Sequence, residues 1–248
     1  MRSRGGRSSR VGIWRIATLS VAGAVLVQCS SASPPPAPTS SPSVAKTSPS
    51  AHKPPPAAPT PPAAAIQPVS AADLGPSWHP GCPIDAQQLR RVDVTYIGFD
   101  GQTHRGALIV HEDLAEEVVA IFEQLLQLHY PIEKVHTVDN YPGADDELSM
   151  EDNNTSAFNC RDIPGTGRWS LHAYGRAIDL NPLLNPYIDD TGAFQPKNAG
   201  PYLDRSLTDP GLLHDGDAAV RVFTDHGWRW GGYWRTPKDY QHFERRDQ

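Results

Sequence analysis

The sequence lacks an excess of basic charge, a long apolar run and an internal repeat. Residues 1–28 hold five arginines and no acid, and the rest of the chain has 17 basic against 28 acidic side chains. A body this acidic repels phosphate backbones, and no basic stripe with interleaved aromatic residues occurs, so nucleic acid is excluded as a partner. The apolar run at residues 16–27 is shorter than the roughly 20 residues that a membrane-spanning helix needs.

Residues 30–69 contain almost no aromatic or branched apolar side chains and are rich in proline, alanine, serine and threonine. Such a segment cannot bury enough apolar surface to fold. We therefore expect a disordered linker over residues 30–73 and a folded part over residues 74–248. The roughly 175 residues of that part are enough for one domain and too few for two.

The N-terminus is typical of an export signal, because an arginine-rich start precedes the apolar run. It ends in Leu26-Val27-Gln28-Cys29-Ser30, which resembles a bacterial lipoprotein box, in which the cysteine is lipidated and becomes the new N-terminus. Gln28 departs from that pattern, which has Gly, Ala or Ser before the cysteine. The sequence predicts a signal peptide over residues 1–29 and an exported protein, either anchored through a lipid on Cys29 or secreted.

The other two cysteines, Cys82 and Cys160, belong to the folded part. In an oxidising compartment, two cysteines in one folded domain favour a disulfide. The alternative is that they are two separately buried thiols.

A β-hairpin is predicted near the start of the folded part. Residues 92–99 alternate apolar and polar side chains and end in the turn signal Asp100-Gly101, and residues 106–110 form a second apolar run. This order of strand, turn and strand is typical of a hairpin.

Apolar residues at helical spacing predict helices over residues 113–129 and 217–226. Short strands are expected at residues 178–180 and 241–243. Because helices and strands are segregated along the chain, the predicted class is α+β. We expect a single compact domain with a small antiparallel sheet and flanking helices.

The segment with the most potential metal ligands runs from Ser170 to Pro182 and holds His172 and Asp179 on either side of a glycine turn. Strand parity places Asp179 on one face and its apolar neighbours on the other, so the carboxylate faces a cleft while the apolar face packs into the core.

A third ligand, His242, comes from the C-terminus. Two nitrogens and one oxygen leave a fourth zinc position open for water, which is typical of a catalytic zinc site. Water bound to zinc has a pKa of about 7, and a nearby carboxylate can take its proton during attack on a carbonyl. Asp239, three residues before His242, is the candidate for that base.

These residues form the pattern Ser-x-His-x-x-Gly-x-Ala-x-Asp, beginning at Ser170, and a late Asp-x-x-His-Phe-Glu, beginning at Asp239. Together they resemble the M15 family of zinc peptidases, which are D-alanyl-D-alanine carboxypeptidases and dipeptidases, with related L-alanyl-D-glutamate endopeptidases. The resemblance runs from about Gly81 to Glu244 and includes Phe158-Asn159-Cys160-Arg161. At the position of Asp239 many members have glutamate instead.

The resemblance implies one zinc ion held by His172, Asp179 and His242. It implies that Asp239 is the catalytic acid and base, and that Arg161 stabilises the substrate carbonyl in the transition state. It also implies a compact α+β fold shared with the hedgehog signalling domain, and peptidoglycan stem peptides as the substrate.

Plain structural interpretations compete with two of these roles. His172 could be an ordinary buried histidine that bonds Asp179 without a metal. Asp239 follows Lys238 and could form a solvated ion pair with it.

Arg161 could simply pair with Asp162 or Glu151 near the surface. Three further residues are candidates for substrate binding, although each could equally be a turn or core residue: Ser170, Tyr174 and Trp230.

The functional hypothesis is an exported zinc peptidase, monomeric, with membrane contact only through a lipid on Cys29. One alternative is a non-catalytic, zinc-containing module of hedgehog-like fold that binds cell wall without cutting it. A protease acting on ordinary L-peptides is the third.

Overall fold

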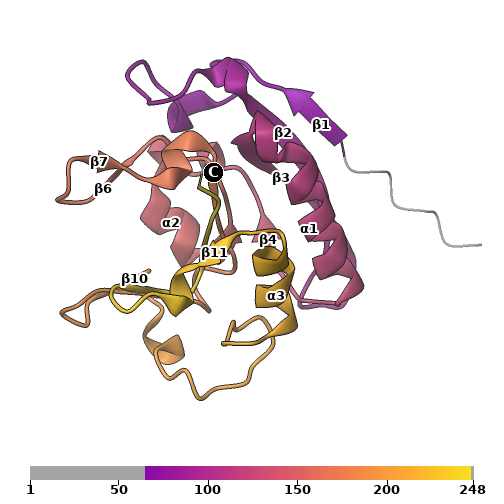
Figure 1. Cartoon of the computed structure of the whole chain (residues 1–248), viewed down its shortest axis with the longest axis vertical. Helices are drawn as coiled ribbons and strands as arrows, with labels where there is room; N and C mark the ends of the chain where they lie inside the picture. The colour runs from indigo at the N-terminus through magenta and orange to yellow at the C-terminus, as the bar shows by residue number, and fades with distance from the viewer. Residues whose placement is uncertain (1–64, 247–248) are drawn as a thin grey trace, which may run out of the picture. The chain divides into compact units, whose positions relative to one another are not determined.

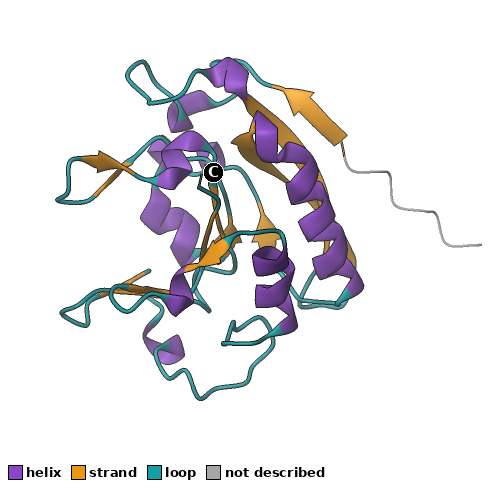
Figure 2. Cartoon of the chain, in the orientation of Figure 1, coloured by secondary structure: helices purple, strands orange, loops and turns teal. Residues whose placement is uncertain are grey.

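The computed structural model describes residues 65–246, which Figures 1 and 2 show by position along the chain and by secondary structure. The predicted export signal, Cys29 and residues 30–64 of the predicted linker lie outside the described residues. Within the described part, no helix is long and apolar enough to cross a membrane.

An antiparallel sheet of three strands opens the fold, in the order β1 (Ala65–Pro68), β2 (Leu89–Ile97) and β3 (Thr103–His111). Strands β2 and β3 pair along their whole length, from Leu89 opposite His111 to Ile97 opposite Thr103. The predicted hairpin is therefore confirmed. Helix α1 (Ala115–Gln127) lies along this sheet (Figure 1) and buries its apolar stripe against it, as the helical spacing predicts.

The fold begins earlier than the sequence predicts. Strand β1 pairs with β2 through Ala65 opposite Asp93 to Pro68 opposite Arg90, so the predicted linker boundary at residue 73 is wrong. The strand is held by main-chain pairing rather than by burial, since Ile66 is 41% exposed. A composition argument looks for apolar side chains and therefore does not detect such a strand.

The other two α-helices are short. Helix α3 (Ala218–Asp225) lies within the predicted helix at residues 217–226 and ends before Gly227. Helix α2 (Asp146–Glu151) was not predicted. Single turns of 3-10 helix connect the elements: η1 (Gly75–Ser77), η2 (Ala86–Gln88), η3 (Glu112–Leu114), η4 (Val138–Asn140), η5 (Pro142–Ala144), η6 (Leu171–Tyr174), η7 (Gly200–Tyr202) and η8 (Gly231–Tyr233).

The remaining strands are two or three residues long and form four small sheets. Two sheets have three strands: β11 (Arg229–Trp230), β13 (His242–Glu244) and β8 (Ala177–Asp179), and β10 (Phe194–Gln195), β9 (Tyr187–Ile188) and β12 (Lys238–Asp239). Two are pairs: β4 (Lys134–Val135) with β5 (Asn154–Thr155), which is parallel, and β6 (Asp162–Ile163) with β7 (Arg168–Trp169), which is antiparallel. The predicted strands at residues 178–180 and 241–243 correspond to β8 and β13.

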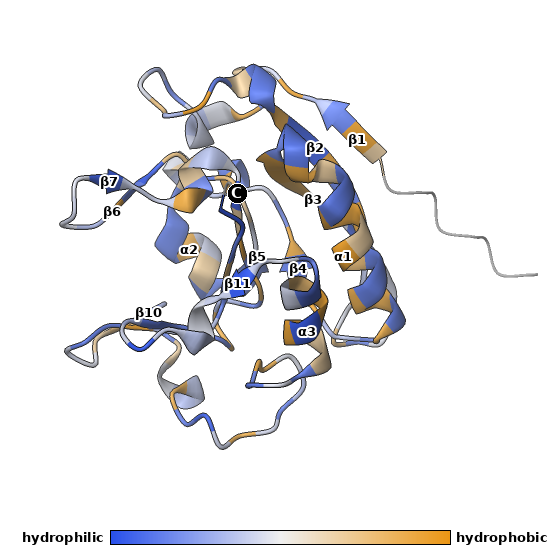
Figure 3. Ribbon diagram, viewed as in Figure 1, coloured by the Kyte–Doolittle hydropathy of each residue, from blue (hydrophilic) through white to orange (hydrophobic). Residues whose placement is uncertain are grey.

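The main apolar core joins α1 and α3 to one face of β2 and β3 and to β8 and β13. Figure 3 shows α1 with both apolar and hydrophilic residues, as expected of a helix with one buried face. A second cluster, which includes Leu74, Ile109 and Phe158, covers the opposite face of the hairpin. Helices and small antiparallel sheets around these cores confirm the predicted α+β class.

Candidate active site

Three buried side chains from separate elements meet at one point: His172 in η6, Asp179 at the end of β8 and His242 at the start of β13. They are 2%, 3% and 7% exposed. Strands β8 and β13 pair with His242 directly opposite Asp179, and directly opposed residues point to the same face. The next pair, Ile178 and Phe243, points the other way and lies in the main core, as strand parity predicts.

A glycine turn brings His172 back towards β8. Gly175 ends η6 with a φ of +65°, and a Cβ added there would lie 2.5 Å from the backbone nitrogen of His111. Any larger residue would be strained and would push η6 off the hairpin. The glycine in the sequence pattern therefore has a structural reason.

Four potential donor atoms of these residues lie close together: one ring nitrogen of each histidine and the two carboxylate oxygens of Asp179. His172 Nε2 lies 3.1 Å from Asp179 Oδ2, His242 Nδ1 lies 3.1 Å from Asp179 Oδ1, and the two nitrogens are 3.1 Å apart. A tetrahedral zinc with ligand distances of 2.0–2.2 Å has donor atoms about 3.3–3.6 Å from one another. With one ligand atom from each residue, a slight expansion of the cluster would fit such an ion, so these residues could hold a small divalent cation.

The outer nitrogen of each histidine has its own acceptor. His172 Nδ1 lies 2.5 Å from the carbonyl oxygen of Ala157, which can only accept, so Nδ1 carries the proton. His242 Nε2 lies 3.5 Å from Oε2 of Glu244, a carboxylate that is itself 4% exposed. Such outer partners fix the tautomer of metal-binding histidines and turn the free lone pair inward. Here both inner nitrogens face Asp179.

The electrostatics of the cluster favour a positive charge at its centre. Burial alone would raise the pKa of Asp179, but His172 and His242 outweigh it and hold that pKa far below its usual range. Burial alone would lower the pKa of His242, but hydrogen bonds to Asp179 and Glu244 raise it to about 10. The alternative interpretation was a buried His172 that bonds Asp179 without a metal. The structure also brings His242 to Asp179, and this convergence of three ligand residues favours a cation site.

Asp239 lies in β12, and its Oδ1 is buried without a hydrogen-bond partner among residues 65–246. Burial raises the pKa of Asp239 to about 6. Two smaller effects partly cancel, because the charge of His242 lowers this pKa and the charge of Asp179 raises it. Lys238 donates instead to the carbonyl oxygen of Gly232 at 2.8 Å, so the alternative of a Lys238–Asp239 ion pair is not observed. Gly231 allows the close packing here, because a Cβ at Gly231 would lie 2.8 Å from the Asp239 Cβ.

Arg161 pairs with an acid that the sequence did not indicate. Its Nη2 lies 2.9 Å from Oδ2 of Asp146, so the predicted alternatives Asp162 and Glu151 are wrong. Its Nε is buried without a partner in the described part of the chain. Burial lowers the pKa of Arg161, but Asp146, Asp179 and Asp239 outweigh this and raise it. The guanidinium therefore interacts with both the cation cluster and the candidate base.

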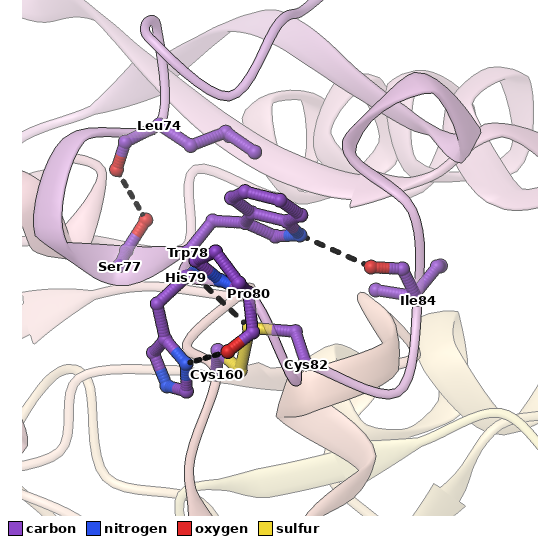
Figure 4. Close-up of a disulfide and its surroundings, with 8 residues drawn as sticks. All are labelled: Leu74, Ser77, Trp78, His79, Pro80, Cys82, Ile84 and Cys160. Carbon is purple, nitrogen blue, oxygen red and sulfur yellow. Dashed lines mark hydrogen bonds between the residues drawn. A yellow bond between two sulfur atoms is a disulfide. The ribbon is translucent and has the colours of Figure 1, made fainter.

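A disulfide joins Cys82 to Cys160, with an S–S distance of 2.00 Å, and fixes the residue directly before Arg161 (Figure 4). The alternative of two separate thiols is not what the structure contains. His79 lies beside the disulfide, with its backbone N–H 3.2 Å from Sγ of Cys82. His79, Cys82 and Cys160 lie close enough together to hold a metal ion. Because the two sulfurs are bonded to each other, however, neither cysteine offers a thiolate to a metal.

The three candidate substrate-binding residues lie in different surroundings. The hydroxyl of Ser170 accepts from the backbone N–H of His172 at 3.3 Å and caps η6, which corresponds to the turn alternative. Tyr174 is half-buried at the end of η6. Trp230 is 2% exposed in the main core, and its indole N–H donates to the carbonyl oxygen of Tyr240.

Trp230 also lines a hollow of about 310 Å³. The lining of this hollow is mostly aromatic: Thr224, Trp228, Arg229, Trp230, Tyr233 and Trp234. Trp234, rather than Trp230, approaches the site, because its ring centroid lies 5.4 Å from that of His242.

Sequence reasoning missed Glu244 and Asp146. Glu244 could have been found, since it lies two residues after His242 in a strand and parity puts both side chains on one face. Asp146 gave no signal, because it is one of several acids before a short helix and its contact with Arg161 depends on the tertiary fold.

Comparison with known proteins matches residues 164–245 to the model of a family described as D-alanyl-D-alanine carboxypeptidase. The matched segment contains the three candidate cation ligands and Asp239, and it begins just after Arg161. No curated protein and no solved structure matches the chain.

Proposed function

Because the chain belongs to the M15 family of peptidases through residues 164–245, we propose that it is a zinc-dependent peptidase of peptidoglycan stem peptides. The observation that carries this proposal is the convergence of His172, Asp179 and His242, in which each histidine nitrogen lies 3.1 Å from an oxygen of Asp179 and 3.1 Å from the other nitrogen. Two imidazoles and one carboxylate are typical ligands of a catalytic zinc, which leaves a position for water or substrate. A zinc ion bound there would polarise the scissile carbonyl and acidify a bound water.

Asp239 is proposed as the general base and acid. Its free, buried oxygen can accept the proton of the attacking water and return it to the leaving amine. With a pKa of about 6, it is mostly ionised at neutral pH and still acidic enough to donate.

Arg161 is proposed to stabilise the negative charge that develops on the carbonyl oxygen. Asp146 occupies one end of its guanidinium, and its Nε is buried and free to donate. A fixed donor that faces developing charge in a site shielded from water is worth more to catalysis than the same donor in water.

Export to the cell envelope is part of the proposal. It is supported by the arginine-rich N-terminus and by the disulfide, which persists in oxidising compartments. Cys29 would carry the lipid of a lipoprotein, and the enzyme would act as a monomer.

The test is digestion of defined muropeptides by the purified chain, with products weighed by mass spectrometry. Release of D-alanine identifies a D-alanyl-D-alanine carboxypeptidase, and cleavage between L-alanine and D-glutamate identifies an endopeptidase. A chelator should stop either reaction and added zinc should restore it. Zinc binding without any product would favour the non-catalytic cell-wall module, and casein cleavage alone would favour a general protease.

A further inference from the structure

The segment that ends in Arg161 is held from two opposite sides. Asn159 and Arg161 both reach Asp146, with Asn159 Nδ2 at 3.4 Å from Oδ1 and Arg161 Nη2 at 2.9 Å from Oδ2. Cys160, between them, bonds in the other direction to Cys82, and its backbone N–H donates to Ser77 at 3.0 Å. The backbone N–H of Arg161 also donates to the carbonyl oxygen of Asn159 at 2.9 Å, which closes a three-residue turn centred on Cys160.

The same segment is tied by its backbone to the cation ligands. The carbonyl oxygen of Ala157 accepts from the ring of His172, and the backbone N–H of Asn159 donates to the carbonyl oxygen of His172. Ser170 donates its backbone N–H to the carbonyl oxygen of Arg161. The backbone of Arg161 is therefore well fixed relative to the cation site, and what remains free is its long side chain.

Three successive acids at the start of α2 have three different partners. Asp145 is the N-cap and accepts from the backbone N–H of Leu148 at 3.0 Å. Glu147 accepts from the backbone N–H of Lys197 at 2.7 Å. Only Asp146 faces the segment of Arg161. Acidic residues are generally favoured at helix N-termini, which explains why three of them occur together here. It does not explain why each of the three bonds a different group.

Arg161 needs such a partner because other carboxylates compete for it. Asp179 and Asp239 both attract its guanidinium electrostatically, and the arginine side chain has many rotamers among which it could choose. An arginine that folded onto either carboxylate would be lost to the substrate carbonyl. The bond to Asp146 holds one edge of the guanidinium and leaves Nε free.

We infer that Asp146 is a positioning residue, which holds the guanidinium of Arg161 in the orientation that meets the transition state, while the Cys82–Cys160 disulfide anchors the same segment from behind. This inference rests on the proposed peptidase function. It assigns a role to a residue outside the segment that the family model matches.

The test compares Asp146→Asn with Asp145→Asn in the full chain, because both variants remove one negative charge from adjacent positions. Asparagine is as good an N-cap as aspartate, so Asp145→Asn should behave as the wild type. Asp146→Asn should lower kcat about tenfold with little change in KM, because the lost interaction serves the transition state. Its zinc affinity and Tm should match those of Asp145→Asn.

Two further measurements separate positioning from a general structural effect. A phosphinate analogue of the tetrahedral transition state should bind Asp146→Asn more weakly by the same factor as kcat falls. In an Arg161→Ala background, Asp146→Asn should cause no further loss, since the two residues act as a unit. Asp146→Glu should recover part of the activity.

Equal kcat for Asp146→Asn and Asp145→Asn, in an active wild type, overturns the inference and leaves the proposed function intact. A tenfold loss that persists in the Arg161→Ala background also overturns it, because Asp146 then does not act through Arg161. A wild type that releases no product from any muropeptide overturns the proposed function, and the inference with it.

Discussion

The cation ligands and the arginine are held in place by different means. His172, Asp179 and His242 are positioned mainly by backbone groups: the pairing of β8 with β13, the glycine turn at Gly175, and the bonds of Ala157 and Asn159 to His172. All three side chains belong to the segment that the family model matches. Arg161 lies before that segment and is positioned by Asp146 and by a disulfide that spans 78 residues of sequence. The site therefore combines a candidate metal centre that is held by backbone groups with an arginine that is held through side-chain bonds.

If this contrast holds, damage to the two parts should be separable. Changes to the first part should remove the metal, and changes to the second should leave the metal bound and slow the reaction. The predictions below test this separation.

The largest effect is expected from loss of a cation ligand. His172→Ala should abolish zinc binding and reduce muropeptide hydrolysis to background, because two ligands do not make the tetrahedral site. Zinc content by atomic absorption, measured beside activity, checks both. His79→Ala is the control, since His79 is exposed and lies beside the disulfide rather than at the site. A His172→Ala protein that keeps one tightly bound zinc would contradict the assignment.

Loss of the base should slow catalysis and spare the metal. Asp239→Ala should keep zinc bound and lower kcat about 10²–10⁴-fold, which is the usual contribution of general acid–base catalysis. Steady-state kinetics with zinc content measured on the same sample decide this. Asp190→Ala, which removes an exposed acid from the turn between β9 and β10, is the matched control. Asp239→Ala with unchanged kcat would refute the assigned role.

Removal of the disulfide should affect the arginine rather than the metal centre. Cys82→Ser with Cys160→Ser should lower the free energy of unfolding by about 2–5 kcal/mol, because the crosslink closes a long loop. Below its Tm this variant should still bind zinc, because the pairing of β8 with β13 and the bonds of Ala157 and Asn159 to His172 do not require the bond between the two sulfurs. Chemical denaturation and zinc titration test the two statements separately. Loss of zinc binding from a folded variant would show that the two parts are not independent.

The sequence predicted well those elements whose apolar residues recur at a regular spacing. The hairpin β2–β3, helix α1 and the parity of Ile178 follow from periodicity, which reports burial directly. Strand β1 escaped because its pairing is made by the main chain. The partner of Arg161 escaped because nothing in the run Asp145-Asp146-Glu147 distinguishes the acid that turns inward. Burial of Trp230 could not be told from a cleft position, since a large aromatic residue suits both.

The smallest of the four effects should come from a change to Glu244, whose carboxylate lies next to the candidate ligand His242. Glu244→Gln removes the carboxylate that faces the outer nitrogen of His242, and loss of such a partner typically costs about 10–100-fold in metal affinity. Competition with a chromogenic zinc chelator measures this, and kcat at saturating zinc should change far less than in Asp239→Ala. Glu112→Gln is the control, because Glu112 pairs with Arg90 at a distance in sequence from the site. Unchanged zinc affinity in Glu244→Gln would mean that the backbone of β13 orients His242 without help from Glu244. Glu244 would then not belong to the candidate metal centre.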